Sequence, residues 1–172
     1  MSVDLASLIA DVPDYPQPGI VFKDLTPLLE DPTGLKEAVD RIAAGHPAGS
    51  VDKVVGIEAR GFLLAAPVAY LLGAGVVPVR KPGKLPREVH ERSYDLEYGS
   101  NTLAVHQDAF RPGDRVLVVD DVLATGGTAA AAVHLVEHCG ATVVAVEVLL
   151  ELEFLHGRKA LEGVAVRAVL TA

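Results

Sequence analysis

Apolar runs alternate with helix-like segments through the middle and C-terminal half of the chain. Short runs rich in β-branched residues and one longer continuous run predict buried strands over 54–57, 76–79, 116–119 and 142–150. Between them, Gly61–Leu72 and Thr128–Cys139 have the composition and length of helices, and Gly140 suits the end of the second. Two strand–helix–strand units predict an α/β fold with a central, mostly parallel sheet flanked by helices. The continuous apolar character of 142–150 is typical of parallel strands covered on both faces.

The N-terminal part predicts two further helices, over Val3–Ala10 and Pro32–Ala44. Arg80–Asp95 (RKPGKLPREVHERSYD) shows no regular apolar period, and its five basic and two acidic residues leave it at +3. An aperiodic connection of this length is usually a lid or a binding loop. We therefore expect a mobile lid that binds an anionic ligand. The alternative is a solvated loop with no role.

Composition narrows the class of protein. The 172 residues favour a single domain, 1–172, and a chain of this size needs no disulfide or metal to fold. The net charge of −8 argues against nucleic acid or an anionic membrane as partner, and no apolar run is long enough to span a membrane. The N-terminus lacks the basic region of a signal peptide, and the single cysteine, Cys139, fits a reducing cytoplasm. We expect a cytoplasmic protein that binds small molecules.

The segment Val116–Thr128 (VLVVDDVLATGGT) leads from a buried strand through two acids into a glycine-rich turn that opens a helix. The glycines let the backbone turn tightly and approach a ligand, and the N–H groups of a helix N-terminus favour a phosphate. Asp120 and Asp121 follow the strand at the edge where open α/β sheets bind ligands. There they can accept hydrogen bonds from sugar hydroxyls or approach hydrated Mg²⁺. The alternative is a purely structural turn in which Thr128 caps the helix.

VVDDVLATGGT resembles the phosphoribosyl-diphosphate signature of type I phosphoribosyltransferases, and alone it would indicate only that superfamily. Five further blocks follow the order found in the members that act on adenine: YPQPGIVFKD (15–24), GIEARGF (56–62), RKPGKLP (80–86), YDLEYG (94–99) and LLELEFLHGR (149–158). The resemblance implies a pentosyltransferase of purine salvage. Such an enzyme transfers the 5-phosphoribosyl group of 5-phospho-α-ribose 1-diphosphate to adenine, releases AMP and diphosphate, uses Mg²⁺ and works as a homodimer.

The resemblance also implies roles for individual residues. Catalytic roles fall to Glu97, Asp120, Asp121 and Arg60, with both aspartates on the ribose hydroxyls and Glu97 exchanging a proton with a purine ring nitrogen. The 5′-phosphate is bound by Ala124, Thr125, Gly126, Gly127 and Thr128. The diphosphate is bound by Ala59, Arg60, Arg80 and Lys84, of which Arg80 and Lys84 act across the dimer interface. Adenine is bound by the ring of Phe22, the backbone of Val21 and Lys23, and Leu152. Mg²⁺ is held mainly by the diphosphate and waters, with Asp120 as the candidate protein ligand.

Three positions depart from the family pattern. Glu58-Ala59 stands where many relatives have Asp-Ser, at a peptide bond that is often cis in the family, and the change removes a hydroxyl near the diphosphate. Pro82 stiffens the basic loop, and Tyr15 replaces the more usual Phe. None of the three lies in the signature, so they bear on affinity more than on activity.

Other readings of the sequence stay open at this stage. The base could be a 6-oxopurine or xanthine, or the chain could be a binding protein that kept the phosphate loop and lost catalysis. His134–His138 (HLVEH) matches a zinc-protease pattern, but helical periodicity places its polar residues on the solvent face, opposite an apolar face that includes Leu135 and Val136.

Overall fold

The computed structural model describes residues 3–96 and 99–172, and the chain forms two compact units that meet in sequence at Arg41 and Ile42. None of the helices in the described ranges is long and apolar enough to cross a membrane.

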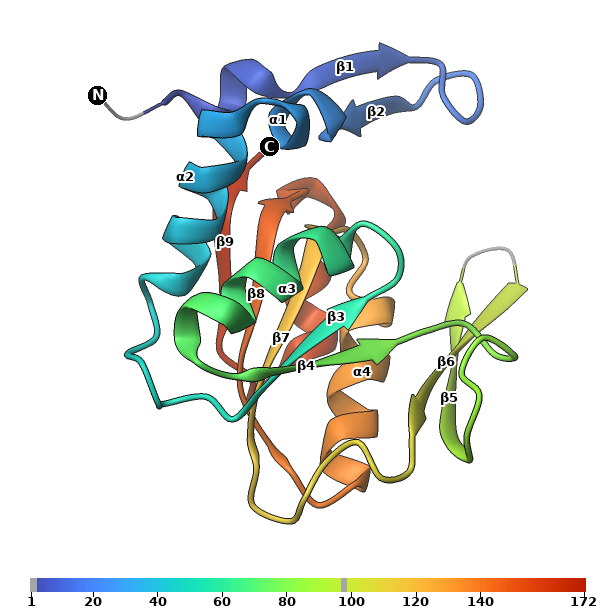
Figure 1. The fold of residues 1–172 in the computed structure, drawn as a ribbon. Coiled ribbons are helices and arrows are strands. Elements are labelled where there is room, and N and C mark those ends of the chain that lie inside the picture. The colour runs from blue at the N-terminus through green and yellow to red at the C-terminus, as the bar shows by residue number, and fades with distance from the viewer. Residues whose placement is uncertain (1–2, 97–98) are drawn as a thin grey trace. The chain divides into compact units, whose positions relative to one another are not determined.

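A five-stranded parallel sheet organises the C-terminal unit, with the order β4-β3-β7-β8-β9 (Figure 1). Its strands are β3 (Lys53–Ile57), β4 (Gly75–Val79), β7 (Arg115–Leu123), β8 (Thr142–Glu151) and β9 (Val166–Thr171). From the central pair, β3–α3–β4 and β7–α4–β8 extend in opposite directions. Right-handed crossovers therefore place α3 (Gly61–Leu72) and α4 (Gly127–His138) on opposite faces. The predicted α/β fold is confirmed: the four predicted strands and the helix Gly61–Leu72 lie within these elements, and the helix predicted over Thr128–Cys139 ends one residue earlier, at His138.

The core of the C-terminal unit lies between the sheet and its helices. Val116–Val119 of β7 are fully buried, as a strand covered on both faces requires. On α4 the predicted division of the helix is confirmed: Leu135 and Val136 are buried, whereas His134 and His138 are exposed. Two short 3₁₀ helices, η2 (Glu153–Leu155) and η3 (Gly157–Leu161), follow β8.

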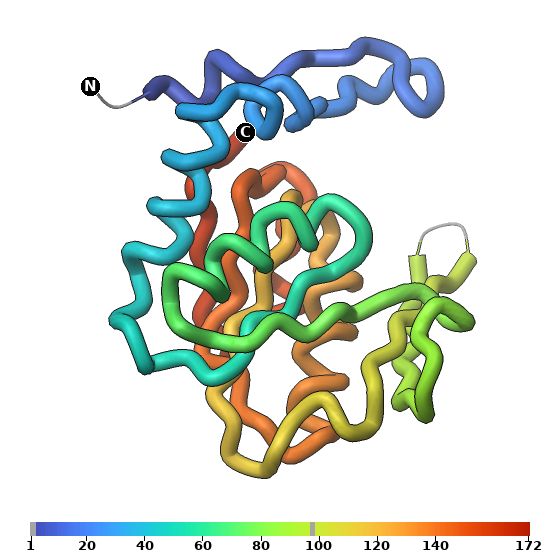
Figure 2. Tube along the Cα trace, in the orientation of Figure 1, coloured from blue at the N-terminus to red at the C-terminus, as the bar shows by residue number. Residues whose placement is uncertain are grey.

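The expectation of an aperiodic connection over Arg80–Asp95 is wrong for its second half. Val89–Leu96 forms β5, which pairs antiparallel with β6 (Gly99–His106), and Figure 2 shows the trace running from β4 through this hairpin toward β7. The backbone of Arg80 also pairs with that of Ala104, which ties the end of β4 to β6. Both faces of β5 are largely exposed, so no alternation of apolar residues marks it in the sequence.

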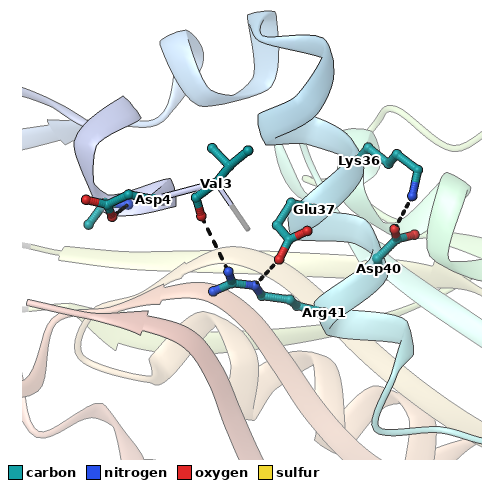
Figure 3. Close-up of polar contacts among 7 residues, drawn as sticks. Val3, Asp4, Lys36, Glu37, Asp40 and Arg41 are labelled. Carbon is teal, nitrogen blue, oxygen red and sulfur yellow. Dashed lines mark hydrogen bonds and ion pairs between the residues drawn. The ribbon is translucent and has the colours of Figure 1, made fainter. Parts of the chain in front are cut away.

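The N-terminal unit begins with η1 (Leu5–Leu8) and an antiparallel pair, β1 (Ala10–Pro13) and β2 (Val21–Asp24). Helices α1 (Thr26–Glu30) and α2 (Pro32–Ala43) follow. The helix predicted over Val3–Ala10 is wrong, because only one 3₁₀ turn forms before the chain enters β1 to pair with β2. Figure 3 shows how α2 holds the start of the chain: Arg41 binds Glu37 at 2.8 Å and reaches the carbonyl of Val3. The second predicted helix, Pro32–Ala44, is confirmed as α2.

Candidate active site

The two acids of the signature belong to β7 itself rather than to the turn after it. Asp120 and Asp121 are 8% and 6% exposed, and each accepts one backbone hydrogen bond, from the N–H of Asp121 at 2.9 Å and of Val122 at 2.8 Å. Burial, and then the charge of Asp121, raise the pKa of Asp120 well above its ordinary value. Because adjacent buried acids cost stability, their presence at a strand end indicates a binding role.

The N-terminus of α3 lies against Asp120 because its first residue is a glycine. A Cβ on Gly61 would fall 2.8 Å from Oδ1 of Asp120 and 3.3 Å from the carbonyl oxygen of Val119. The Arg-Gly-Phe sequence thus allows a close approach that a side chain would prevent. It also brings Arg60, directly before α3, to the second acid.

Arg60 forms an ion pair with Asp121, with 2.6 Å between Nε and Oδ2. The contact is electrostatic rather than an aligned hydrogen bond, because Oδ2 has no hydrogen-bond partner among the described residues. The Arg60 side chain is 40% exposed. The structure therefore joins the cation predicted to bind diphosphate to one of the acids predicted to bind ribose.

The loop from Ala124 to Thr128 leads from the end of β7 into the first turn of α4. Gly126 has φ +88°, which favours glycine, and a Cβ there would lie 2.2 Å from the carbonyl oxygen of Gly157. Helix α4 begins at Gly127, and the N–H of Ala130 donates to the carbonyl of Gly126 at 2.9 Å. The N–H groups of the first turn, with the hydroxyls of Thr125 and Thr128, form a donor set that suits a phosphate.

A second glycine contact supports this loop, and sequence reasoning gave it no role. A Cβ on Gly157, the first residue of η3, would fall 2.4 Å from the carbonyl oxygen of Ala124. Next to it, the guanidinium of Arg158 binds both carboxylate oxygens of the buried Glu151 at 2.7–3.0 Å. The block LLELEFLHGR contains all three residues, but its sequence gives no sign of which backbone Gly157 contacts.

Arg80 and Lys84 converge on Glu58. Nε of Arg80 donates to Oε2 at 2.8 Å, and Nζ of Lys84 lies 3.3 Å from Oε1. Burial opposes ionisation of Glu58, but hydrogen bonds from both cations outweigh it and hold the pKa of this carboxyl below its ordinary value. The peptide bond between Glu58 and Ala59 is cis, as in the family pattern. Thus Glu58 gathers two of the predicted diphosphate-binding cations two residues before the third, Arg60.

The remaining predicted residues are divided between the two units. Val21, Phe22 and Lys23 lie on β2 of the N-terminal unit, where the Phe22 ring packs edge-to-face on Tyr15 at 5.2 Å. Leu152 lies directly after β8 in the C-terminal unit, and its N–H donates to the carbonyl of Leu123 at 2.9 Å. Glu97 lies outside the described residues.

Comparison with known proteins gives one consistent family. The family model for the phosphoribosyl transferase domain matches residues 29–167 of the sequence. The adenine phosphoribosyltransferase of Thermobifida fusca is 58% identical over 99% of both chains. The crystal structure of adenine phosphoribosyltransferase from Thermoanaerobacter pseudethanolicus superposes with a TM-score of 0.94 at 45% identity, over 98% of both chains.

The Saccharomyces cerevisiae enzyme, solved with an imino-altritol bisphosphate and adenine, has a TM-score of 0.91 at 37% identity, over 97% of both chains. The identity to enzymes of one activity extends over nearly the whole chain, and the central parallel sheet with its helices superposes on that of their solved structures. This chain belongs to the adenine phosphoribosyltransferases, pentosyltransferases of the phosphoribosyl transferase family.

Proposed function

We propose that the chain joins adenine to 5-phospho-α-ribose 1-diphosphate through the residues gathered at the carboxyl ends of β3 and β7. In this reaction the bond from ribose C1′ to a diphosphate oxygen breaks, and its electron pair leaves with diphosphate. The bond from C1′ to the purine nitrogen forms, and that nitrogen loses its proton. The observation that carries the proposal is the junction of β7 and α4, where two buried acids precede a donor-rich turn.

The loop, the two acids and the nearby cations would each bind a different part of the substrate. The loop Ala124–Thr128 holds the 5′-phosphate, a remote group whose binding energy orients the reacting ribose. Asp120 and Asp121 accept hydrogen bonds from the ribose hydroxyls. Arg60, Arg80 and Lys84, with the backbone of Ala59, neutralise the negative charge that develops on the leaving diphosphate.

Mg²⁺ fits this donor set as a metal held mainly by the substrate. Among residues 3–96 and 99–172, no group of three or more His, Cys, Asp or Glu side chains is placed to hold a metal ion. Mg²⁺ usually keeps several waters and binds one or two carboxylates together with substrate phosphates. Asp120 would supply the protein contact, and the ion would add positive charge at the diphosphate.

The purine is handled by residues outside the β7–α4 junction. Phe22 would stack on adenine, the backbone of Val21 and Lys23 would read its edge, and Leu152 would pack beside it. Glu97 would take up the proton that the purine loses. The similarity to adenine phosphoribosyltransferases and the adenine bound to the yeast enzyme support this choice of base.

We propose that the active unit is a cytoplasmic homodimer formed through one face of α3. Leu63, Tyr70 and Leu71 are 55%, 86% and 49% exposed, and spacings of seven and eight residues place them on one side of the helix. Val76 of the edge strand β4 is also half exposed. A group of large apolar side chains this exposed suits burial against a second copy.

A base screen tests the function. With phosphoribosyl diphosphate and Mg²⁺, we expect turnover of adenine and little or none of hypoxanthine, guanine or xanthine. A preference for an oxopurine would change the base assignment. No turnover of any base, in protein that binds phosphoribosyl diphosphate, would favour a binding protein that lost catalysis.

A further inference from the structure

Tyr94 of the hairpin is hydrogen-bonded to the loop that we assign to the 5′-phosphate. Its hydroxyl lies 2.9 Å from Oγ1 of Thr128, 34 residues further along the chain. Its ring lies against the neighbouring residue, because a Cβ on Gly127 would fall 3.0 Å from Cδ2 of the tyrosine. Tyr94 thus contacts both residues that open α4.

The chemistry of the two hydroxyls gives this contact a direction. A threonine hydroxyl has one proton to donate and lone pairs that accept. If Thr128 donates its proton to a phosphate oxygen, the hydrogen bond to Tyr94 survives only with the tyrosine as donor. The phenol is the more acidic hydroxyl and therefore the better donor, so the chain of bonds runs from Tyr94 to Thr128 to the phosphate.

The hairpin does not depend on this bond for its place on α4. The ring of His90 on β5 contacts that of His138 on α4, with centroids 4.7 Å apart. Eight residue pairs connect β5 to β6, with Tyr94 opposite Asn101. Removal of the Tyr94 hydroxyl therefore takes away one polar contact and leaves the docking of the hairpin in place.

We propose that Tyr94 is a positioning residue for the 5′-phosphate, because its hydroxyl orients the Thr128 hydroxyl toward that phosphate. The inference rests on the proposed role of the loop Ala124–Thr128. It adds a residue from outside the signature to that site. Because β5 ends at Leu96, directly before Glu97 in sequence, the same bond connects the phosphate loop to the strand that leads to the proposed proton acceptor.

The test compares Tyr94→Phe with Ser93→Ala. Ser93 is the neighbouring residue of β5, and it makes a similar hydroxyl–hydroxyl bond, to Thr102 at 2.8 Å, away from the loop. Calorimetry of AMP and adenine separates the phosphate from the base. For Tyr94→Phe we expect AMP affinity to fall about 3- to 10-fold, the size of one neutral hydrogen bond, with adenine affinity unchanged. KM for phosphoribosyl diphosphate should rise similarly with kcat within about twofold, whereas Ser93→Ala should match the parent protein.

Thr128→Val distinguishes failure of this inference from failure of the proposed site. If Thr128→Val weakens AMP and adding Tyr94→Phe costs nothing more, the two hydroxyls act as one unit and the inference holds. If Thr128→Val weakens AMP but Tyr94→Phe does not, the Tyr94 inference is wrong and the loop assignment stands. If Thr128→Val leaves AMP binding unchanged, the Thr128 hydroxyl does not bind the phosphate, and both its assignment and the Tyr94 inference are wrong. Equal losses for AMP and adenine in Tyr94→Phe would indicate a merely structural role and overturn the inference.

Discussion

Asp120 carries a carboxyl that is costly to ionise where it lies, because it is buried and next to Asp121. The raised pKa has a consequence for stability with a definite sign. A carboxyl whose pKa is higher in the folded than in the unfolded state stabilises the fold below its unfolded pKa, about 3.9. That contribution is lost as the pH rises through the folded-state value. At neutral pH the buried carboxyl of Asp120 therefore lowers the free energy of unfolding relative to its value at low pH.

We predict that Asp120→Asn melts at or above the temperature of the parent protein at pH 7, and that this difference shrinks toward pH 4. The amide oxygen can still accept the N–H of Asp121, so the fold keeps that bond. Activity should change the other way, because a lost charge-assisted hydrogen bond to ribose costs about 1.5–3 kcal/mol, or roughly 10- to 150-fold in kcat/KM. Thermal melts at the two pH values and steady-state kinetics check both parts.

The companion variant Asp121→Asn should lose kcat/KM by the same order and also releases the ion pair with Arg60. Unchanged kcat/KM in both variants would remove the two carboxylates from the site. An Asp120→Asn protein that melts lower at pH 7 than its parent would contradict the argument from burial.

Glu97→Gln should lower kcat by about 10²–10⁴-fold, the usual contribution of general acid–base catalysis. Affinity for phosphoribosyl diphosphate should hardly change, since a carboxylate repels phosphates and does not hold them. Glu91→Gln is a matched control, because Glu91 is an exposed acid of β5 whose partner across the hairpin is Ala104. If kcat of Glu97→Gln stays within about threefold of the parent, another group takes the purine proton.

Helices and strands that bury apolar residues could be predicted from the sequence. The β3–α3–β4 and β7–α4–β8 units could be predicted because their apolar runs are continuous and glycines stand at the helix ends. Strand β5 could not, since its residues are mostly exposed and it becomes a strand only by pairing with β6. The contact between Gly157 and Ala124 could not be predicted either, because it depends on where η3 lies after β8.

Gly157→Ala should disturb the phosphate loop from outside it. The added methyl group would meet the carbonyl oxygen of Ala124 at 2.4 Å and Cγ of Leu123 at 3.0 Å, so backbone must shift. We expect loss of about 1–3 kcal/mol of stability, as overpacking costs, together with weaker AMP binding. Gly75→Ala is the control, because the three atoms nearest to its methyl group would all belong to the flexible side chain of Lys53. AMP affinity and thermal stability equal to the control would show that η3 does not support the loop.

The two halves of the predicted lid, Arg80–Asp95, should differ in how a ligand changes their hydrogen exchange. Amides of β5 that pair with β6 should be protected with and without ligand. Amides of the preceding segment, 81–88, should gain protection with phosphoribosyl diphosphate and Mg²⁺, because the cations that now bind Glu58 would turn to the diphosphate. Equal exchange of 81–88 in both states would exclude a lid there.

At the scale of the whole molecule, the positive charge is concentrated where the site needs it. The chain carries −8 overall, yet Arg60, Arg80 and Lys84 all lie at or near the ends of β3 and β4. In the single chain each is paired with an acid, Arg60 with Asp121 and the other two with Glu58. Binding of diphosphate must therefore compete with these internal pairs.

Mixing two impaired variants tests whether Lys84 serves the site of a second chain. Lys84→Ala and Asp120→Asn should each have strongly lowered activity as homodimers. In a heterodimer with shared sites, one site combines the intact Asp120 of one chain with the intact Lys84 of the other. Random mixing puts about half of the dimers in this form with one working site in two, so activity should return to about a quarter.

The contact between Lys84 and Glu58 of the same chain makes the opposite result informative. If heterodimers form, as mass measurement can verify, and no activity returns, then Lys84 acts on the diphosphate of its own chain, beside the acid that holds it in this structure. A Leu63→Glu variant gives the second control, because a charge on the exposed face of α3 should disrupt the proposed dimer. With a shared site, the monomer that results should lose activity although its Asp120 and Lys84 are intact. A fully active monomer would show that one chain holds the complete site.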